Sequence, residues 1–463
     1  MSIGVLCAVR GPGESVVVTA LGSGATVTVV RRCADLAELL AASAAGLGHL
    51  AVVSADLPHL DREAVAQLHA ARVRVLALTG TVPGQVERMG ALGVDAVVDD
   101  DPPGPALLAA VLALAQVRED DLGGRPQGWP ARADGAGGAA DRMDPADRAD
   151  LARLRAASGD WVETGPAPAA AGRVVAVWGP AGAPGRSTVA INLAAELAEL
   201  ADRGATGAAH AGVLLIDADT YGGTVAQLLG MLDESPGLAA AARAAALGGL
   251  DRATFARLTP VLAPGLRVLT GISRASRWPE LSASALEVVW ELARGLAAWT
   301  VVDCGFCLEQ DEALSYDTRA PRRNEATISA LEAADVVVVV GSGDPVGVQR
   351  LVRGLADLAN LPEVAQTRRI VVVNRLRASA AGPRPGEAIA ASLQRFAGIE
   401  APHVIPDDGA GVDAAVLRGA TLREVAPGSP VRRAISGLAV LVAQPVTEPR
   451  RRGRRALGRS ARR

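Results

Sequence analysis

Short apolar runs alternate with amphipathic stretches along the first 116 residues of the chain. The runs have the length of β-strands, whereas the stretches between them repeat apolar positions at helical spacing. Strands that alternate with helices pair in parallel, because each helix returns the chain across one face of the sheet. The predicted elements are strands at Ile3–Val9, Thr26–Val30, His49–Ser54, Val73–Thr79 and Ala96–Val98, and helices at Leu36–Ala45, Arg62–Ala71, Gly84–Leu92 and Pro105–Val117.

This alternation predicts a flavodoxin-like α/β domain over residues 1–116. Residues 117–172 change character, because Asp, Arg, Gly, Ala and Pro dominate there and no apolar period is sustained. We interpret them as a flexible linker that carries one helix near Pro145–Ala157. Strand–helix alternation resumes at Arg173. It predicts a second α/β domain with a doubly wound, mostly parallel sheet over residues 173–443, and an Arg-rich tail follows over residues 444–463.

The composition constrains how the two cores are built and which partners fit. Apolar residues make up 49% of the chain but aromatic residues only 2%, so the cores depend on Ala, Val and Leu. All 47 basic residues are Arg, and residues 450–463 combine many of them with no acidic residue. The rest of the chain is therefore more acidic than the net charge of -3 indicates, which argues against nucleic-acid binding through bulk charge.

Cysteine content and apolar segment length predict a cytoplasmic protein. Four cysteines (Cys7, Cys33, Cys304 and Cys307) are too few for a disulfide scaffold in a chain of 463 residues, and they suit a reducing compartment. The first residues lack the basic stretch that precedes the apolar core of a signal peptide. No uninterrupted apolar stretch reaches the ~20 residues that a membrane span needs.

A glycine-rich turn, Gly179–Thr188, has the sequence context of a phosphate-binding loop. It follows the β-branched run Val174–Trp178 and precedes a helical pattern. Backbone N–H groups in such a turn can converge on phosphate oxygens at the positive end of the helix dipole. Ser187 is placed to ligate Mg²⁺, with Thr188 beside it. An ordinary Gly/Pro turn between a strand and a helix is the alternative interpretation.

The loop departs from the usual phosphate-loop pattern at two chemically important positions. Arg186 stands where the pattern has Lys, and a guanidinium neutralises phosphate without copying the geometry of an ammonium. Pro184 has no N–H group, so one potential phosphate donor is missing. The loop therefore favours nucleotide binding over rapid hydrolysis.

Further candidate ligand contacts follow later apolar runs of the second domain. Asp217 and Asp219 end the run that begins at Val213, and Asp303 ends the run that begins at Trp299. An open α/β sheet binds its ligand at the carboxyl ends of its parallel strands, where these carboxylates are expected. Alone, Asp217 and Asp219 would rather indicate an acidic turn after a strand, but their place after a phosphate loop favours ligand binding.

Cys304 and Cys307 form a C-x-x-C sequence, which can indicate a redox or metal site. No second pair of cysteines stands near it, because Cys7 and Cys33 belong to the other predicted domain. We therefore favour the interpretation in which Cys304 simply belongs to the strand end, and the metal or redox interpretation is the alternative.

Taken in order, the motifs of residues 173–442 resemble those of the ParA/MinD family of P-loop ATPases. Within it the chain best resembles the CpaE/TadZ-like pilus-assembly branch, whose members join a receiver-like N-terminal domain to a ParA-like ATPase domain. The resemblance implies ATP and Mg²⁺ as cofactors and a nucleotide-dependent homodimer. It implies catalytic roles for Asp219 and Arg186, Mg²⁺ ligation by Ser187, Asp217 and Asp303, and nucleotide contacts from Gly182, Ala183, Pro184, Gly185, Arg186, Ser187, Thr188, Gly305, Asn374 and Pro406.

A third departure of the loop emerges from this resemblance. The family has a signature lysine early in its loop, which reaches across the dimer, and Ala181 stands at that position here. The resemblance therefore implies slow hydrolysis, performed by an enzyme that lacks one of the usual cations.

The N-terminal domain resembles receivers without their phosphorylation chemistry. Counting back from Pro58 places Ser54, not an Asp, at the phosphoacceptor position. No acidic residue follows the first strand before Glu14, and Asp99–Asp101 stand where receivers have a Lys. Only Thr79 matches, at the switch hydroxyl. We expect an adaptor surface for dimerisation or localisation, and a generic flavodoxin-like domain is the alternative.

The leading hypothesis is a weakly hydrolysing ATPase that localises or assembles a Tad/Flp-type pilus or secretion machine through nucleotide-dependent dimerisation. Its expected partners are a second copy and pilus, secretion or polar-localisation proteins, and not nucleic acid. The alternatives are a non-hydrolysing nucleotide-sensing scaffold and a septum-site or chromosome-partitioning ATPase. The tail has one Leu and no apolar face, which favours a solvated segment. Electrostatic contact with the anionic inner face of the plasma membrane, at ~1 kcal/mol per Arg, is the other interpretation.

Overall fold

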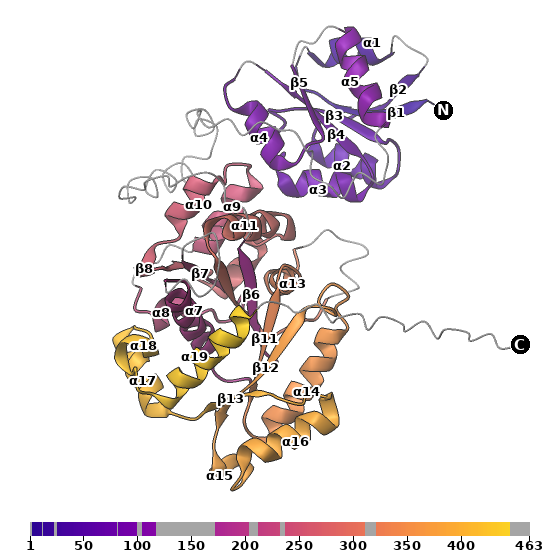
Figure 1. The fold of residues 1–463 in the computed structure, drawn as a ribbon. Helices are drawn as coiled ribbons and strands as arrows, with labels where there is room; N and C mark the ends of the chain where they lie inside the picture. Colours follow the sequence, from indigo (N-terminus) through magenta and orange to yellow (C-terminus); the bar gives the residue numbers. More distant parts are fainter. Residues whose placement is uncertain are drawn as a thin grey trace, which may run out of the picture.

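The computed structural model contains two units built on parallel or mostly parallel sheets, one between Ile3 and Gln116 and one between Arg173 and Ala443 (Figure 1). It describes residues 2–11, 13–22, 26–80, 82–99, 104–116, 172–202, 212–231, 237–310 and 321–444. The predicted helix near Pro145–Ala157 and nearly all of the predicted linker and tail lie outside these ranges.

The N-terminal unit has a five-stranded parallel sheet in the order β2-β1-β3-β4-β5, which is the flavodoxin-like order. Helices α1 and α5 cover one face, and α2, α3 and α4 cover the other. The strands are β1 Ile3–Ala8, β2 Val27–Arg32, β3 Leu50–Ser54, β4 Arg74–Thr79 and β5 Ala96–Asp99. The helices are α1 Gly13–Gly22, α2 Leu36–Ala44, α3 Arg62–Ala70, α4 Gln85–Leu92 and α5 Gly104–Gln116.

The C-terminal unit has an eight-stranded sheet in the order β13-β12-β11-β6-β10-β7-β9-β8. All neighbouring strands are parallel except the last pair, so the predicted mostly parallel α/β architecture is confirmed. The strands are β6 Arg173–Trp178, β7 Val213–Ala218, β8 Val261–Ala263, β9 Leu266–Leu269, β10 Trp299–Cys304, β11 Val336–Ser342, β12 Arg368–Leu376 and β13 His403–Pro406.

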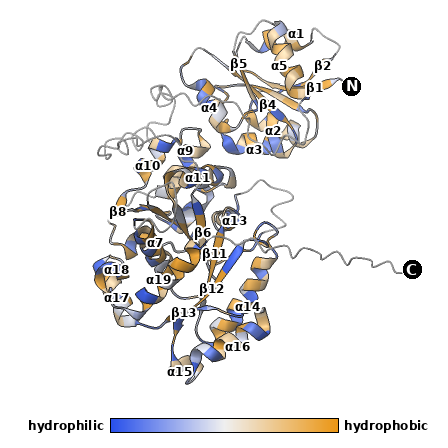
Figure 2. Cartoon of the chain, in the orientation of Figure 1, coloured by the Kyte–Doolittle hydropathy of each residue, from blue (hydrophilic) through white to orange (hydrophobic). Residues whose placement is uncertain are grey.

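Helices cover both faces of this larger sheet (Figure 1), and mainly Ala, Val and Leu fill the layers between them. Figure 2 shows that the strands of both sheets are largely hydrophobic. Helices α7 and α19 lie on one face, and α9, α11, α13 and α14 on the other. The helices are α7 Arg186–Asp202, α8 Val225–Leu228, α9 Gly237–Ala246, α10 Arg252–Leu258, α11 Ala283–Leu296, α13 Glu325–Glu332, α14 Pro345–Ala359, α15 Ala378–Ala381, α16 Pro385–Ala397, α17 Gly409–Arg418, α18 Leu422–Val425 and α19 Pro430–Ala443, with a 3₁₀ helix η3 at Ala275–Glu280.

The order of the larger sheet fixes where a ligand fits. The chain leaves β6 towards β7 on one side, and later fills the other side of β6 with β11. A crevice forms at the carboxyl ends of strands where the order reverses in this way. The segment that follows β6, which is the predicted phosphate loop, therefore lies at the expected ligand position.

The two units touch through α3 and α4 on one side and α9 and α11 on the other (Figure 1). Arg62 Nε donates to the carbonyl oxygen of Ser284 at 2.8 Å, and the Ser284 hydroxyl donates to Glu63 Oε2 at 2.8 Å. None of the helices in the described ranges is both long and apolar enough to cross a bilayer.

Candidate phosphate-binding site

The loop between β6 and α7 has a backbone that only glycine adopts easily. Gly182 and Gly185 have φ values of 74° and 82°, in the left-handed region that disfavours side chains. The N–H of Ala183 donates to the Pro180 carbonyl at 3.0 Å, which closes a tight turn. Helix α7 then begins at Arg186, so the N–H groups of its first turn, which have no partners within the helix, lie beside the loop with Ser187 and Thr188.

Two asparagines fix this loop and the start of α7, one at the end of β12 and one within α7 itself. Asn374, at the end of β12, donates from Nδ2 to the Pro184 carbonyl at 2.9 Å. Asn192 donates to the Thr188 carbonyl at 2.8 Å and accepts from the Leu422 N–H at 2.8 Å. The sequence predicted Asn374 as a nucleotide contact but did not reveal its contact with the loop. It missed Asn192 altogether, although a lone amide on an apolar helix face was the available signal.

Asp303 is the most unusual group of the site. It is fully buried, and neither of its carboxylate oxygens has a hydrogen-bond partner. Burial raises its pKa well above the usual value and the neighbouring Asp217 raises it further, while the nearby Ser187 hydroxyl and Arg186 act in the opposite direction. Ser187 is close enough to favour the ionised form without making a hydrogen bond of ordinary geometry. Buried carboxylates are normally paired, so this one indicates a missing positive partner.

Asp217 lies beside Asp303 on the adjacent strand, because β7 and β10 pair in register at these two residues. Its two oxygens accept from the backbone N–H groups of Asp219, at 3.2 Å, and Val225, at 3.1 Å. Burial nevertheless raises the pKa of Asp217 to about 7. Because its oxygens are already engaged, Asp217 is a weaker candidate for direct metal ligation than Asp303.

Asp219 forms an ion pair with Arg186, with 3.6 Å between Asp219 Oδ2 and Arg186 Nη2. The other oxygen of Asp219 accepts from the N–H groups of Tyr221 and Gly222. Arg186 Nη1 also donates to the Gly179 carbonyl at 3.4 Å, and its buried Nε has no partner. The two residues predicted to be catalytic therefore lie together, and both are engaged with protein groups.

The remaining predicted contacts lie along the same sheet edge. A methyl group at Gly305 would come within 3.3 Å of Asp219 Oδ1, so this glycine borders the acidic cluster. Pro406 ends β13 and pairs with Leu376, two residues beyond Asn374. The structure thus gathers the residues proposed from sequence at the carboxyl ends of β6, β7, β10, β12 and β13.

The donor set fits Mg²⁺ held jointly with phosphate. No group of three or more His, Cys, Asp or Glu side chains is arranged as a complete metal site in the described ranges. Mg²⁺ needs no such cage, because it keeps several waters and takes one or two protein oxygens besides those of the phosphates. The unpaired carboxylate of Asp303 and the hydroxyl of Ser187 are suitable protein oxygens.

Cys304 and Cys307 are both free thiols in the structure. Cys304 is fully buried, and its thiol donates to the carbonyl oxygen of Val302, two residues earlier, at 3.6 Å. Cys307 accepts from Asn324 Nδ2 at 3.3 Å. Burial raises the pKa of Cys304 well above the usual value, which makes this thiol a poor nucleophile or metal ligand at neutral pH.

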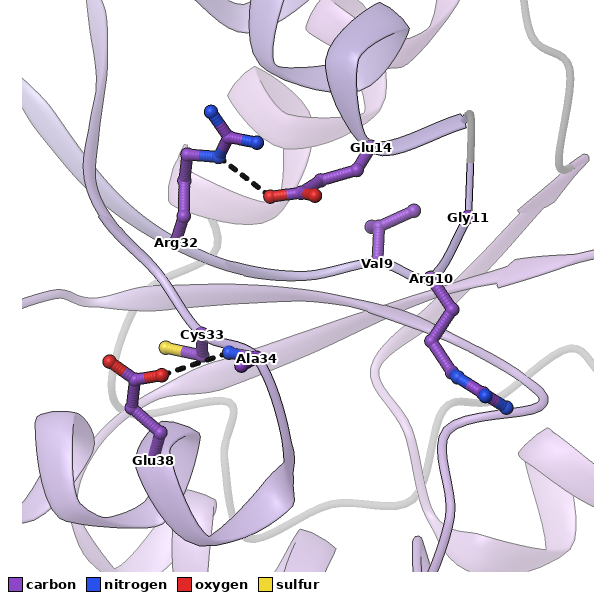
Figure 3. A pocket seen from close by; sticks show the side chains of 8 residues that line it. All are labelled: Val9, Arg10, Gly11, Glu14, Arg32, Cys33, Ala34 and Glu38. Carbon is purple, nitrogen blue, oxygen red and sulfur yellow. Dashed lines mark hydrogen bonds and ion pairs between the residues drawn. The ribbon is translucent and has the colours of Figure 1, made fainter.

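A hollow of about 330 Å³ lies in the N-terminal unit, at the ends of β1 and β2 (Figure 3). Its acidic side chains are already paired: Glu14 with Arg32 at 2.6 Å, and Glu38 with the Ala34 N–H at 2.9 Å (Figure 3). At the end of β3, the buried Ser54 hydroxyl accepts from the Arg10 N–H at 3.2 Å. The lining residues are Val9, Arg10, Gly11, Glu14, Arg32, Cys33, Ala34 and Glu38.

Comparison with known proteins gives similarities of fold. No family model and no curated protein sequence matches the chain. A ParA family ATPase from Chlorobium tepidum is 18% identical, with a TM-score of 0.48, over 58% of this chain and 98% of that one. The cell division ATPase MinD of Pyrococcus furiosus is 19% identical, with a TM-score of 0.44, over 58% of this chain and 98% of that one. The signal receiver domain of the response regulator NarL from Mycobacterium tuberculosis is 24% identical, with a TM-score of 0.24, over 25% of this chain and 98% of that one.

Proposed function

We propose that the chain binds ATP with Mg²⁺ in the loop 179–188 and acts as a slow ATPase of the ParA/MinD type. The observation that carries the proposal is the carboxylate of Asp303, which is fully buried and unpaired next to the Ser187 hydroxyl. An unpaired buried carboxylate destabilises the fold, so its presence indicates a ligand that pairs with it. A cation bound together with phosphate at the start of α7 would be such a ligand.

The proposed roles follow from the positions of the side chains. The N–H groups at the start of α7 and the guanidinium of Arg186 bind phosphate oxygens. Ser187 and Asp303 hold Mg²⁺, with Asp217 beside them. Bound Mg²⁺ neutralises the charge that develops on the phosphates. Asp219 orients the attacking water, and Asn374 and Pro406 border the adenine.

The same contacts support slow turnover. The structure pairs one carboxylate oxygen of Asp219 with Arg186 and the other with two backbone N–H groups, which leaves this carboxylate fewer lone pairs with which to orient a water. Arg186 must leave or share this ion pair to reach a phosphate. Ala181 and Pro184 remove a further cation and a further donor.

The biological role that we propose is the nucleotide-dependent localisation or assembly of a Tad/Flp-type pilus or secretion machine. ATP would favour a homodimer, and hydrolysis would end that state. The support is the order of the sequence motifs, together with a flavodoxin-like N-terminal unit whose candidate phosphoacceptor position is the buried Ser54. Such a unit serves as a docking surface in the cytoplasm, at or near the membrane.

The test is to measure ATP affinity and turnover of the purified chain with Mg²⁺, beside the variant Asp219→Ala. Binding with slow turnover that the substitution abolishes supports the proposal. Failure of the wild-type chain to bind ATP would overturn it, and would leave a fold that is used only for protein contacts.

A non-hydrolysing nucleotide-dependent scaffold is the second candidate, and the Arg186–Asp219 ion pair favours it. The variant Arg186→Lys separates the two candidates, because an ammonium on a flexible stem can restore the usual geometry at the phosphates. A gain in turnover indicates an ATPase limited by its arginine. Unchanged ATP binding without turnover in either protein indicates a scaffold.

A further inference from the structure

A second arginine reaches the phosphate loop from a different element. Arg350 lies in the second turn of α14, and its guanidinium lies against Gly182, so that a methyl group at Gly182 would overlap Arg350 Nη1. Gly182 is thus restricted twice, by its φ of 74° and by this guanidinium. No sequence motif indicated Arg350, because it is far from the loop in the chain.

The position of Arg350 is set by packing rather than by its own polar contacts. Gly354, one turn further along α14, is so close to β6 and the loop that a methyl group there would come within 3.0 Å of Pro180 and 3.1 Å of Trp178. At the start of the helix, Asp344 caps α14 by accepting from the Gly347 N–H at 2.9 Å. These contacts fix α14 against the loop and place residue 350 beside Gly182.

The guanidinium of Arg350 is available to a ligand, in contrast to that of Arg186. Its side chain is exposed, and it makes no ion pair or hydrogen bond within the described part of the chain. Arg186 is half-buried and contacts both Asp219 and the Gly179 carbonyl. The loop thus has one cation that is engaged and one that is free to bind an anion.

We propose that Arg350 is a second phosphate-binding cation of the nucleotide site, which reaches the loop from α14. The proposal deepens the proposed function and rests on it. A polyphosphate carries several negative charges, whereas Arg186 is the only basic residue of the loop 179–188, and Ala181 adds none. A planar guanidinium at Gly182 can bind two phosphate oxygens at once, which adds affinity and geometric selectivity.

The proposal predicts selectivity for the phosphates and not for the nucleoside. Loss of a charge-assisted hydrogen bond to phosphate weakens binding by about tenfold, and the contribution falls as salt screens it. Adenosine, which has no phosphate, does not use Arg350. A purely structural role would instead affect ATP, ADP and adenosine alike.

The experiment compares Arg350→Ala and Arg350→Lys with the control Arg353→Ala in the full chain with Mg²⁺. Arg353 is exposed on the same helix, and its substitution removes the same charge, but Arg350 and not Arg353 lies against Gly182 of the loop. Titrations use ATP, ADP and adenosine at low and high salt. We expect Arg350→Ala to lose about tenfold in ATP and ADP affinity, Arg350→Lys to lose less, and Arg353→Ala to resemble wild type.

The outcomes separate this inference from the proposed function. If the wild-type chain binds ATP and Arg350→Ala and Arg353→Ala have the same ATP affinity, the role of Arg350 is overturned, but the proposed nucleotide site is not. An equal loss for ATP and adenosine would also overturn it, because the effect would then be structural. No ATP binding by the wild-type chain would overturn the proposed function itself, and this inference with it.

Discussion

Asn374 Nδ2 and the carbonyl oxygen of Pro184 are joined by a hydrogen bond of 2.9 Å, although 190 residues separate them in the chain. Pro184 can donate nothing to a phosphate, but its carbonyl anchors the loop to the end of β12. The next residue, Gly185, is left-handed at a φ of 82°, and a side chain there would meet the same amide. The end of β12, two strands away from β6 in the sheet, therefore helps to fix the conformation of the loop.

Asn374→Ala is expected to weaken ATP binding by about fivefold while leaving the protein folded. The substitution removes one neutral hydrogen bond, worth about 1 kcal/mol, and frees the loop to adopt other conformations. Calorimetric titration with ATP and Mg²⁺ measures the effect. Asn360→Ala is the control, because Asn360 is exposed at the end of α14. Equal affinities in the two variants would show that the hydrogen bond does not shape the site.

Asp303→Asn is expected to stabilise the nucleotide-free protein and to abolish its Mg²⁺-dependent stabilisation by ATP. Burial raises the pKa of Asp303 well above the usual value, so the folded state retains a proton that the unfolded state releases. At neutral pH the free energy of unfolding of the wild-type protein should therefore be lower than that of Asp303→Asn by about 1–3 kcal/mol, because the amide has no proton to lose. Urea unfolding with and without Mg²⁺ and ATP measures both effects.

The pH dependence gives a sharper form of that prediction. A carboxyl whose pKa is raised on folding destabilises the protein progressively as pH rises above its unfolded value of about 4. The stability advantage of Asp303→Asn should therefore grow from pH 5 to pH 8. Asp217, whose pKa is also raised, repels the charge of Asp303 in the wild-type protein and has no such neighbour in the variant, which adds to the same trend. An advantage that is constant or shrinks with pH would contradict the account.

Local patterns predicted the buried strands well, because consecutive β-branched residues such as those of β11 have few other structures available. They missed α1, where three consecutive valines, Val16 to Val18, have strand character but belong to a helix whose Val17 packs with residues of α5. They also gave no indication of β8 and β9, which are only 3 and 4 residues long.

The candidate site was predictable only as far as its residues lie in local motifs. Asp303 and Ser187 follow from the strand end and the loop. The ion pair between Arg186 and Asp219, and the position of Arg350, depend on how distant strands and helices meet. A single sequence carries no record of such contacts, so their consequences for the site appear only in the folded structure.

The contact between the two units is expected to couple them. Replacing both Arg62 and Glu63 with Ala removes the hydrogen bonds to Ser284, with a loss of about 1–3 kcal/mol of interaction between α3 and α11. Hydrogen exchange should then become faster in both helices. Glu87→Ala, an exposed substitution on α4, should change neither. Unchanged exchange in the double variant would mean that other contacts between the units carry the coupling.

Glu196 and Arg432 form a buried ion pair that joins α7 to α19, with Arg432 Nε and Nη2 donating to the two carboxylate oxygens at 2.7 and 2.8 Å. Only 3% of the Glu196 side chain is exposed. Glu196→Gln removes the charge, but Arg432 keeps partial access to water because 23% of its side chain is exposed, so we expect a loss of about 1–3 kcal/mol in the free energy of unfolding. Replacing both residues with Met should cost less than the sum of the single Met substitutions, because no charge is then left unpaired.

The effect of Glu196→Gln should be confined to stability. Ten residues of α7, or about 15 Å of helix, separate Glu196 from Arg186 at the phosphate loop. At a temperature where the variant remains folded, its ATP affinity should equal that of wild type, whereas its urea midpoint falls. A matching loss of ATP affinity would show instead that α19 controls the nucleotide site through α7, and the ion pair would then belong to the site.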